Sequence, residues 1–310
     1  MAAALAFWTL IPEARGQSVV KIWDAAPHNA FTDLARWKDR WWCVFREGAG
    51  HVSPDGAIRV LISSDGMKWN SAAIIESANA DLRDPKLTIT PKGELMLTAA
   101  GAMHSPPPKH QTFAWFSKDG RNWGKRVEIG EPDYWLWRVT WHQGTAYGVG
   151  YPTTGGEAVR LYRSRDGKKW EVVNKELFSD GFPNESAIDF DADGTMLILL
   201  RRDKGLQTAV LGVAKLPYVT WRWNNLGVRL GGPNLIRMPD GRLLAAGRLY
   251  DGKTRTSVCE VGETLKELVS FPSGGDTSYP GLVFYNGELW VSYYSSHEGK
   301  TAIYLARWRP

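Results

Sequence analysis

The chain has 310 residues, of which 43% are hydrophobic and 23% charged, and it holds 16 Trp but only 2 Cys. This composition excludes an intrinsically disordered chain and a disulfide framework, and no Cys/His pattern has the spacing of a metal site, so we expect neither a metal nor another cofactor. The net charge of +5 is spread along the chain without a run of Lys or Arg, so we expect no nucleic-acid partner.

The first 17 residues, MAAALAFWTLIPEARGQ, are apolar and then polar, like the end of a secretory signal peptide whose basic n-region is missing. We expect residues 1–17 to be a signal-peptide remnant and the protein to be secreted or periplasmic. The chain contains no run of 18 apolar residues, so we expect no membrane span.

Three segments share the pattern S-x-D-G-x-x-W, beginning at Ser63, Ser117 and Ser164. Each follows one run typical of a β-strand and precedes another. The pattern predicts a hairpin turn in which Asp bonds the local backbone and Gly adopts a positive φ. We expect the Trp that ends each segment to anchor the turn from below.

A longer period runs through the whole chain, because short alternating strands and turn residues recur in units of 45 to 53 residues. The first strand of each unit is expected to begin near Asp33, Asp84, Trp137, Glu185, Asn234 and Tyr279. Six units of about four strands predict an all-β fold, a six-bladed β-propeller in one domain over residues 18–310. The last unit has room for three strands, so residues 19–23 are expected to supply its fourth and close the ring. We expect one helical turn, at residues 265–268.

In a propeller, the starts of the first strands and the ends of the second strands meet on one face. Five of the six units are expected to bring an arginine there: Arg46, Arg83, Arg138, Arg201 or Arg202, and Arg248. Guanidinium groups match carboxylate geometry, so this ring predicts a small anionic ligand. Alternatively, some of these arginines only tie neighbouring loops to Asp33, Asp84 and Glu47.

Glu185 and Tyr279 are expected on the same face. A tyrosine hydroxyl is a poor nucleophile at its ordinary pKa of about 10, and a neighbouring carboxylate that accepts its proton makes it competent. Alternatively, Tyr279 packs on the channel wall and Glu185 pairs with Arg202. Asn234 and Trp137 are expected to line this face, and Trp137 either stacks on a sugar or packs in the wall.

These features resemble the sialidase (neuraminidase) superfamily, whose bacterial members are six-bladed propellers with Asp-box (BNR) repeats. The resemblance covers residues 33–308, and two stretches carry it most specifically. Asn184-Glu185-Ser186, followed by Arg201-Arg202, is similar to the stretch that holds the glutamate assisting the nucleophile. Residues 277–282, TSYPGL, are similar to the stretch that holds the nucleophilic tyrosine.

The chain also departs from that pattern. The first unit of the family carries an arginine where residues 30–34, AFTDL, have none. The resemblance places the general acid about twelve residues before Ser63, at His51, and Glu47 and Asp55 are its neighbours in the same loop. Asp33 and Asp84 complete the set of candidate catalytic carboxylates.

The resemblance implies an exo-glycosidase that releases a terminal acidic sugar, such as sialic acid, with retention of configuration. In that scheme Tyr279 attacks the anomeric carbon, Glu185 takes its proton and His51 protonates the leaving oxygen. The carboxylate of the sugar is then held by Arg83, Arg138, Arg202 and Arg248. Two alternatives remain: a polysaccharide lyase or glycosidase acting on uronate-containing glycans, and a non-catalytic glycan-binding propeller.

Overall fold

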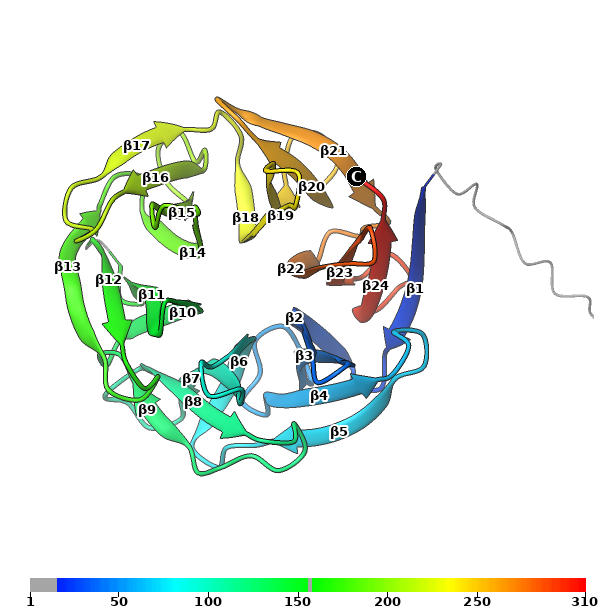
Figure 1. Ribbon diagram of the computed structural model, residues 1–310. Helices are drawn as coiled ribbons and strands as arrows, with labels where there is room; N and C mark the ends of the chain where they lie inside the picture. The colour runs from blue at the N-terminus through cyan, green and yellow to red at the C-terminus, as the bar shows by residue number, and fades with distance from the viewer. Residues whose placement is uncertain (1–15, 156–157) are drawn as a thin grey trace, which may run out of the picture.

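Alternating apolar residues and glycine-containing turns organise residues 16–155 and 158–310, the part that the computed structural model describes, into 24 β-strands. The strands form six four-stranded antiparallel sheets around a common axis (Figure 1), which confirms the six-bladed β-propeller. Within these ranges no helix has the length and apolar character needed to cross a membrane. Most of the expected signal-peptide remnant, residues 1–15, lies outside the described residues.

Each blade is a meander of four strands that runs from the axis outward. The innermost strands are β2 (His28–Trp37), β6 (Ala80–Ile89), β10 (Tyr134–His142), β14 (Pro183–Phe190), β18 (Leu230–Arg237) and β22 (Thr277–Tyr285). The second strands are β3 (Arg40–Gly48), β7 (Leu95–Met103), β11 (Thr145–Pro152), β15 (Met196–Arg202), β19 (Leu243–Leu249) and β23 (Glu288–Ser295). The third strands are β4 (Ala57–Ser63), β8 (His110–Ser117), β12 (Val159–Ser164), β16 (Val210–Ala214), β20 (Arg255–Val261) and β24 (Ala302–Trp308). The outermost strands are β5 (Asn70–Ile75), β9 (Val127–Ile129), β13 (Glu171–Phe178), β17 (Arg222–Asn225), β21 (Leu265–Phe271) and β1 (Gln17–Trp23).

The N-terminal strand closes the ring. β1 pairs antiparallel with β24, so the last blade has the order β1-β24-β23-β22 (Figure 1). This confirms the expected fourth strand and covers the edge of β24 that would otherwise expose unpaired backbone groups.

Two expectations from the sequence are corrected: the type of one short element and the starts of the innermost strands. Residues 265–268 begin strand β21, not a helical turn, because Leu265 returns as the outer partner of Val261 in a hairpin. The six innermost strands also begin two to five residues before the expected starts. The residues at the expected starts lie within bulges of these strands or at their ends.

A bulge at the same place in each innermost strand fixes what faces the axis. The register against the second strand shifts between residues 30 and 33, 83 and 86, 136 and 139, 183 and 186, 231 and 234, and 278 and 281. At three of these bulges a residue other than glycine has a positive φ: Phe31 (64°), Asp84 (49°) and Tyr279 (52°). Such backbone is costly for residues with a Cβ and occurs preferentially at functional sites.

The repeated S-x-D-G-x-x-W segments connect third and fourth strands, as expected, and they also join blades. In the first, Asp65 Oδ1 accepts hydrogen bonds from the N–H groups of Met67 and Lys68, and Trp69 Nε1 donates to the Gly66 carbonyl at 3.0 Å. Gly66 has a φ of +75°, and a Cβ there would lie 2.4 Å from Trp290 of the preceding blade. The repeat is therefore a packing device between neighbouring blades.

Candidate active site

The two halves of the innermost strands line two different ends of the central channel. One end is here called the mouth. Its pocket of about 380 Å³ is lined by the bulge residues Glu185 and Tyr279, by Arg201 of β15, and by the aromatic residues Trp135 and Tyr151. Residues after the bulges line a pocket of about 590 Å³ at the opposite end, here called the far end. The candidate catalytic residues divide between these two ends.

Tyr279 and Glu185 meet at the mouth. The Tyr279 hydroxyl donates a 2.6 Å hydrogen bond to Glu185 Oε1, although the two residues are 94 positions apart in the chain. Burial and the Glu185 carboxylate raise the pKa of Tyr279 well above its usual value, while Arg201 opposes this. The hydroxyl therefore keeps its proton in the free protein and holds it against the carboxylate.

The second oxygen of Glu185 is fixed from two sides. Arg201 Nη1 donates to Glu185 Oε2 at 2.7 Å, and the backbone N–H of Gly232 donates to the same oxygen at 2.8 Å. Gly232 has a φ of +59°, and a Cβ there would lie 3.0 Å from the Tyr279 ring. Glycine at this position therefore allows the backbone donor to approach the carboxylate beside the tyrosine.

Asp84 occupies in the second blade the bulge position that Tyr279 occupies in the last. Its carboxylate is buried, and the Oδ1 atom has no hydrogen-bond partner among the described residues. Burial raises the pKa of Asp84 to about 6, with Glu185 adding to the rise and Lys86 and Arg83 opposing it. A buried carboxyl group that exchanges its proton near neutral pH is a candidate acid–base catalyst.

Lys86 follows Asp84 by two residues and lies toward the far end of the channel. Its ammonium is buried and donates to the Pro85 carbonyl at 3.2 Å, and it lies 5.1 Å from the centre of the Trp137 ring. Burial and the charge of Arg138 lower the pKa of Lys86 to about 8.

Trp137 itself is 3% exposed, so it packs in the channel wall and offers no face to a ligand. Trp135, half-buried and stacked on Tyr151 with ring centroids 5.8 Å apart, lines the mouth pocket instead.

The arginines expected at the mouth fall into two groups. Arg46 is fully buried and bonded to Asp81 at 2.9 Å, while Arg202 is buried and bonded to Asp180 at 2.6 Å. Both therefore stabilise loops and do not reach the pocket. Arg201, the neighbour of Arg202, points the opposite way along β15 and contacts Glu185.

Arg83 and Arg248 do reach the mouth. Arg83 is 16% exposed in its side chain and donates to the His51 carbonyl at 3.1 Å. Its Nε lies 3.9 Å from Asp81 Oδ2 and has no hydrogen-bond partner among the described residues. The Arg248 guanidinium lies 5.5 Å from the centre of the Tyr279 ring and donates to the Thr277 carbonyl through Nε and Nη2. Arg83 and Arg248 thus bring two positive charges to the mouth.

The three residues considered for the general acid have different partners: Glu47 lies at the end of β3, and His51 and Asp55 lie in the loop that follows it. Glu47 is engaged by Arg59 at 2.8 Å and by Trp23 Nε1 at 2.6 Å, so it ties β3 to its neighbours. Asp55 caps the Ala49 N–H group within the loop at 3.0 Å. His51 is half exposed and its Nδ1 lies 3.1 Å from Asp276 Oδ2. Asp276, just before β22, was not among the residues expected from the sequence.

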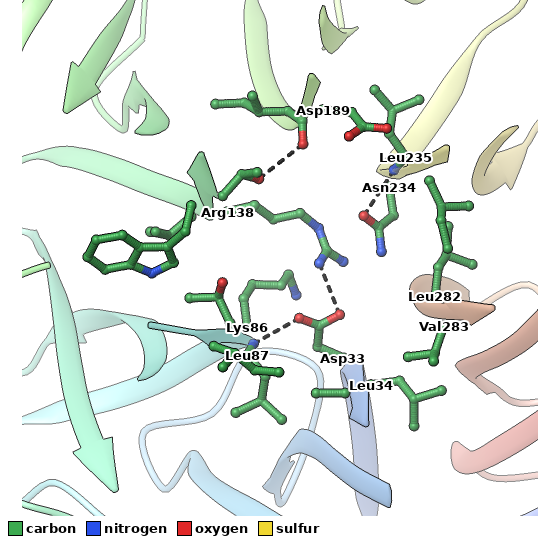
Figure 2. A pocket seen from close by; sticks show the side chains of 18 of the residues that line it. Asp33, Leu34, Lys86, Leu87, Arg138, Asp189, Asn234, Leu235, Leu282 and Val283 are labelled. Carbon is green, nitrogen blue, oxygen red and sulfur yellow. Dashed lines mark hydrogen bonds and ion pairs between the residues drawn. The ribbon is translucent and has the colours of Figure 1, made fainter. Parts of the chain in front are cut away.

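The far end holds three residues that were expected at the mouth. Asp33 accepts a hydrogen bond from Arg138 Nη1 at 3.0 Å and one from the Leu87 N–H at 2.8 Å (Figure 2). Asn234 Nδ2 donates to the Pro280 carbonyl at 3.0 Å, and Arg138 Nη2 donates to the same oxygen at 2.9 Å. Asp33 and Asn234 are the last residues of their bulges, and Arg138 lies within its bulge with its side chain extending to the far end. Their hydrogen bonds connect the innermost strands of several blades.

Comparison with known proteins places the fold but not the chemistry. The chain matches no protein-family model and no curated protein sequence. A protein of unknown function from Dyadobacter fermentans superposes with a TM-score of 0.80 at 19% identity, covering 95% of this chain and 99% of that one. A mutant α-L-arabinofuranosidase from Fusarium graminearum, in complex with an iminosugar inhibitor, gives 0.73 at 13% identity, covering 94% and 97%. A sialidase from Trypanosoma rangeli in complex with the inhibitor DANA gives 0.72 at 11% identity; 94% of this chain aligns, but only 59% of that protein. At these identities the likeness establishes that the chain shares the propeller fold of these proteins.

Proposed function

We propose that the protein is a retaining exo-glycosidase that releases a terminal acidic sugar, with Tyr279 as the nucleophile. The observation that carries this proposal is the 2.6 Å hydrogen bond from the Tyr279 hydroxyl to Glu185 at the mouth pocket. A tyrosine that shares its proton with a fixed carboxylate can become nucleophilic as a bond to the substrate forms. The fold shared with an arabinofuranosidase and a sialidase supports a glycoside as the substrate class.

In the first step the Tyr279 oxygen bonds to the anomeric carbon while the glycosidic bond breaks. The Tyr279 proton passes to Glu185 Oε1, and a proton from Asp84 passes to the leaving oxygen. In the second step water displaces Tyr279 from the anomeric carbon and gives its proton to Asp84, while Glu185 returns the proton to Tyr279. Two displacements at the same carbon give retention of configuration.

Asp84 suits the role of proton donor better than the residues of the β3–β4 loop. Its pKa of about 6 leaves it partly protonated under mildly acidic conditions, as a general acid requires. Glu47 and Asp55 are committed to other partners, and the Nδ1 of His51 is bonded to Asp276.

The charges at the mouth favour an anionic sugar. Arg83 and Arg248 flank the Tyr279 and Asp84 positions, and their positive charges would attract a carboxylate on the substrate. A tyrosine also presents a neutral nucleophile to an anionic substrate, whereas a carboxylate nucleophile would repel it. The stacked Trp135 and Tyr151 rings offer an apolar wall for one face of the sugar ring.

The test is turnover of a substrate panel by purified protein. The panel contains aryl ketosides of sialic acid and related nonulosonic acids, aryl glycosides of uronic acids, and aryl α-L-arabinofuranosides. We expect release of the aryl group from an acidic member, and its loss in Tyr279→Phe. Tyr285→Phe, on the same strand at the far end, is the matched control and should keep wild-type turnover.

Other outcomes overturn the proposal in distinguishable ways. A uronate-containing glycan that yields an unsaturated product with new ultraviolet absorbance would indicate a lyase. Saturable binding without turnover, unchanged in Tyr279→Phe, would indicate a binding protein. Hydrolysis of the arabinofuranoside alone would remove the acidic substrate from the proposal.

A further inference from the structure

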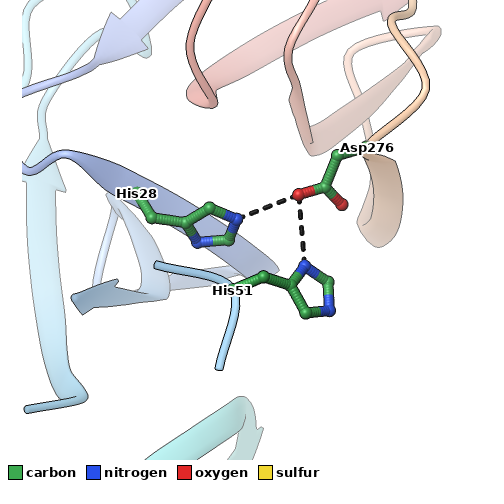
Figure 3. Close-up of side chains that lie close together, drawn as sticks. All are labelled: His28, His51 and Asp276. Carbon is green, nitrogen blue, oxygen red and sulfur yellow. Dashed lines mark hydrogen bonds and ion pairs between the residues drawn. The ribbon is translucent and has the colours of Figure 1, made fainter. Parts of the chain in front are cut away.

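Three potential metal ligands meet beside the mouth, on the seam between the first and last blades. His28 Nε2 lies 2.9 Å and His51 Nδ1 lies 3.1 Å from the same oxygen, Oδ2 of Asp276 (Figure 3). The three atoms lie within 4.8 Å of one another, and this is the one such grouping of His, Cys, Asp or Glu within residues 16–155 and 158–310. The ligands are far apart in the sequence, which is why no spacing pattern revealed them.

The surroundings hold two of these side chains in place. Tyr294 Oη donates to Asp276 Oδ1 at 2.7 Å, which fixes the carboxylate and leaves Oδ2 directed at the histidines. The His28 ring is 10% exposed in its side chain and packs between the rings of Phe31 and Tyr294. His51 is 49% exposed, so the cluster has a buried side and an open side.

The separations are close to those of a bound ion. Zinc binds imidazole nitrogen and carboxylate oxygen at about 2.0–2.2 Å, which for tetrahedral geometry places ligand atoms about 3.4 Å apart. The observed separations from Asp276 Oδ2 are a few tenths of an ångström shorter. An ion therefore fits if the two ring nitrogens move slightly away from Oδ2 and stay within reach of each other, and the half-exposed His51 has room for that shift.

We propose that His28, His51 and Asp276 form a three-ligand site for a divalent transition-metal ion, with Zn²⁺ as the favoured ion. Two imidazoles and one carboxylate suit zinc, whereas Mg²⁺ and Ca²⁺ require sets of oxygen ligands. Three protein ligands leave a coordination position open to water on the exposed side. Because the ligands come from the first and last blades, the ion would connect these two blades where the propeller closes.

The groups behind the ligands set the expected strength of binding. With the ion on Nε2, the His28 ring must carry its proton on Nδ1, which is buried and has no acceptor among the described residues. The absence of such a partner typically weakens metal binding by about 10- to 100-fold. We therefore expect a dissociation constant on the order of micromolar, weaker than that of a structural zinc site.

The experiment is calorimetric titration of ZnCl₂ into full-length protein that has been stripped with chelator. We expect one ion per chain, an increase in Tm on binding, and no heat with MgCl₂. His51→Ala and Asp276→Asn should each lose at least about ten-fold in affinity. His51→Ala changes an exposed side chain, so it should fold normally in the absence of zinc.

His104→Ala is the matched control, because it removes an exposed histidine of the same face that lies outside the cluster. It should bind zinc like the wild type, as should Tyr279→Phe, which makes this test independent of the proposed reaction. The proposal is overturned if the wild type binds no zinc, or if His51→Ala binds zinc as tightly as the wild type. Equal loss in His104→Ala would likewise overturn it.

Discussion

The two ends of the channel are built from the same six strands, yet they use polar residues in opposite ways. At the far end, Asp33, Arg138 and Asn234 bond to each other or to backbone groups and hold the strands together. At the mouth, Asp84 is buried with an oxygen that has no partner in the described part of the chain, and Tyr279 shares its proton with Glu185. The far-end pocket is the larger, about 590 Å³ against about 380 Å³. The proposed reaction is therefore assigned to the smaller pocket, on the basis of its perturbed and unsatisfied groups.

The largest expected effect is at the mouth. Glu185→Gln removes the base that accepts the Tyr279 proton, so kcat should fall by about 10³-fold. The fold should persist because Arg201 keeps its ion pair with Asp203, at 3.0 Å. Steady-state kinetics on the best panel substrate, with thermal melting as the control for folding, measures this. Wild-type turnover in Glu185→Gln would remove Glu185 from the mechanism.

The corresponding change at the far end should act on stability. Asp33→Asn leaves the buried Arg138 guanidinium without its carboxylate, which should cost about 3 kcal/mol of unfolding free energy. The kcat of the folded protein should stay within a few-fold of wild type. Urea denaturation gives the first quantity and kinetics below the transition gives the second. A variant that keeps its stability but loses activity would show that the far end takes part in catalysis.

Asp84→Asn should separate function from stability. The folded protein holds the Asp84 proton up to a pKa of about 6, whereas an ordinary aspartate has a pKa of 3.8. This contribution to stability is present below about pH 4 and is lost as the pH rises through about 6. Asp84→Asn should therefore be more stable than wild type at about pH 8, by about 3 kcal/mol, and similar to it at about pH 4.

The same substitution removes the proposed proton donor, so turnover should fall sharply at every pH. In the wild type, kcat/KM should decline as the pH rises above about 6, because the acid is then ionised. Urea denaturation at the two pH values and a pH–rate profile measure these effects. A variant that is less stable than wild type at the higher pH would contradict the account of Asp84 as a strained, unpaired acid.

The smallest expected effect is on substrate binding. Arg83→Lys keeps the charge but loses the planar fork, so KM for an acidic substrate should rise about ten-fold with kcat nearly unchanged. Arg126→Lys, an exposed arginine bonded to Ser77 and Asn79, is the matched control. An unchanged KM in Arg83→Lys would place the substrate carboxylate elsewhere.

The architecture could be predicted from the sequence because repeated turns and strand periods are local signals. The pairing of Glu185 with Tyr279 was also predicted, since each lies in a distinctive stretch at the start of an innermost strand. The choice between Arg201 and Arg202 was not, because neighbouring residues on a strand face opposite sides and one position of register decides between them. The bulges were not predicted either. Because of them Asp33 and Asn234 face the far end, whereas Asp84 faces the mouth. His28 and Asp276 were missed because their proximity arises only when the ring closes.

The most direct test of the central claim is covalent trapping on Tyr279. The protein is incubated with a 2,3-difluorinated sialic acid, whose fluorine at C3 slows hydrolysis of a glycosyl–enzyme intermediate, and is then mapped by peptide mass spectrometry. The account predicts one sugar adduct on the peptide that contains Tyr279, and none in Tyr279→Phe. An adduct on Glu185 or Asp84, or turnover of sialosides without any adduct on Tyr279, would contradict it.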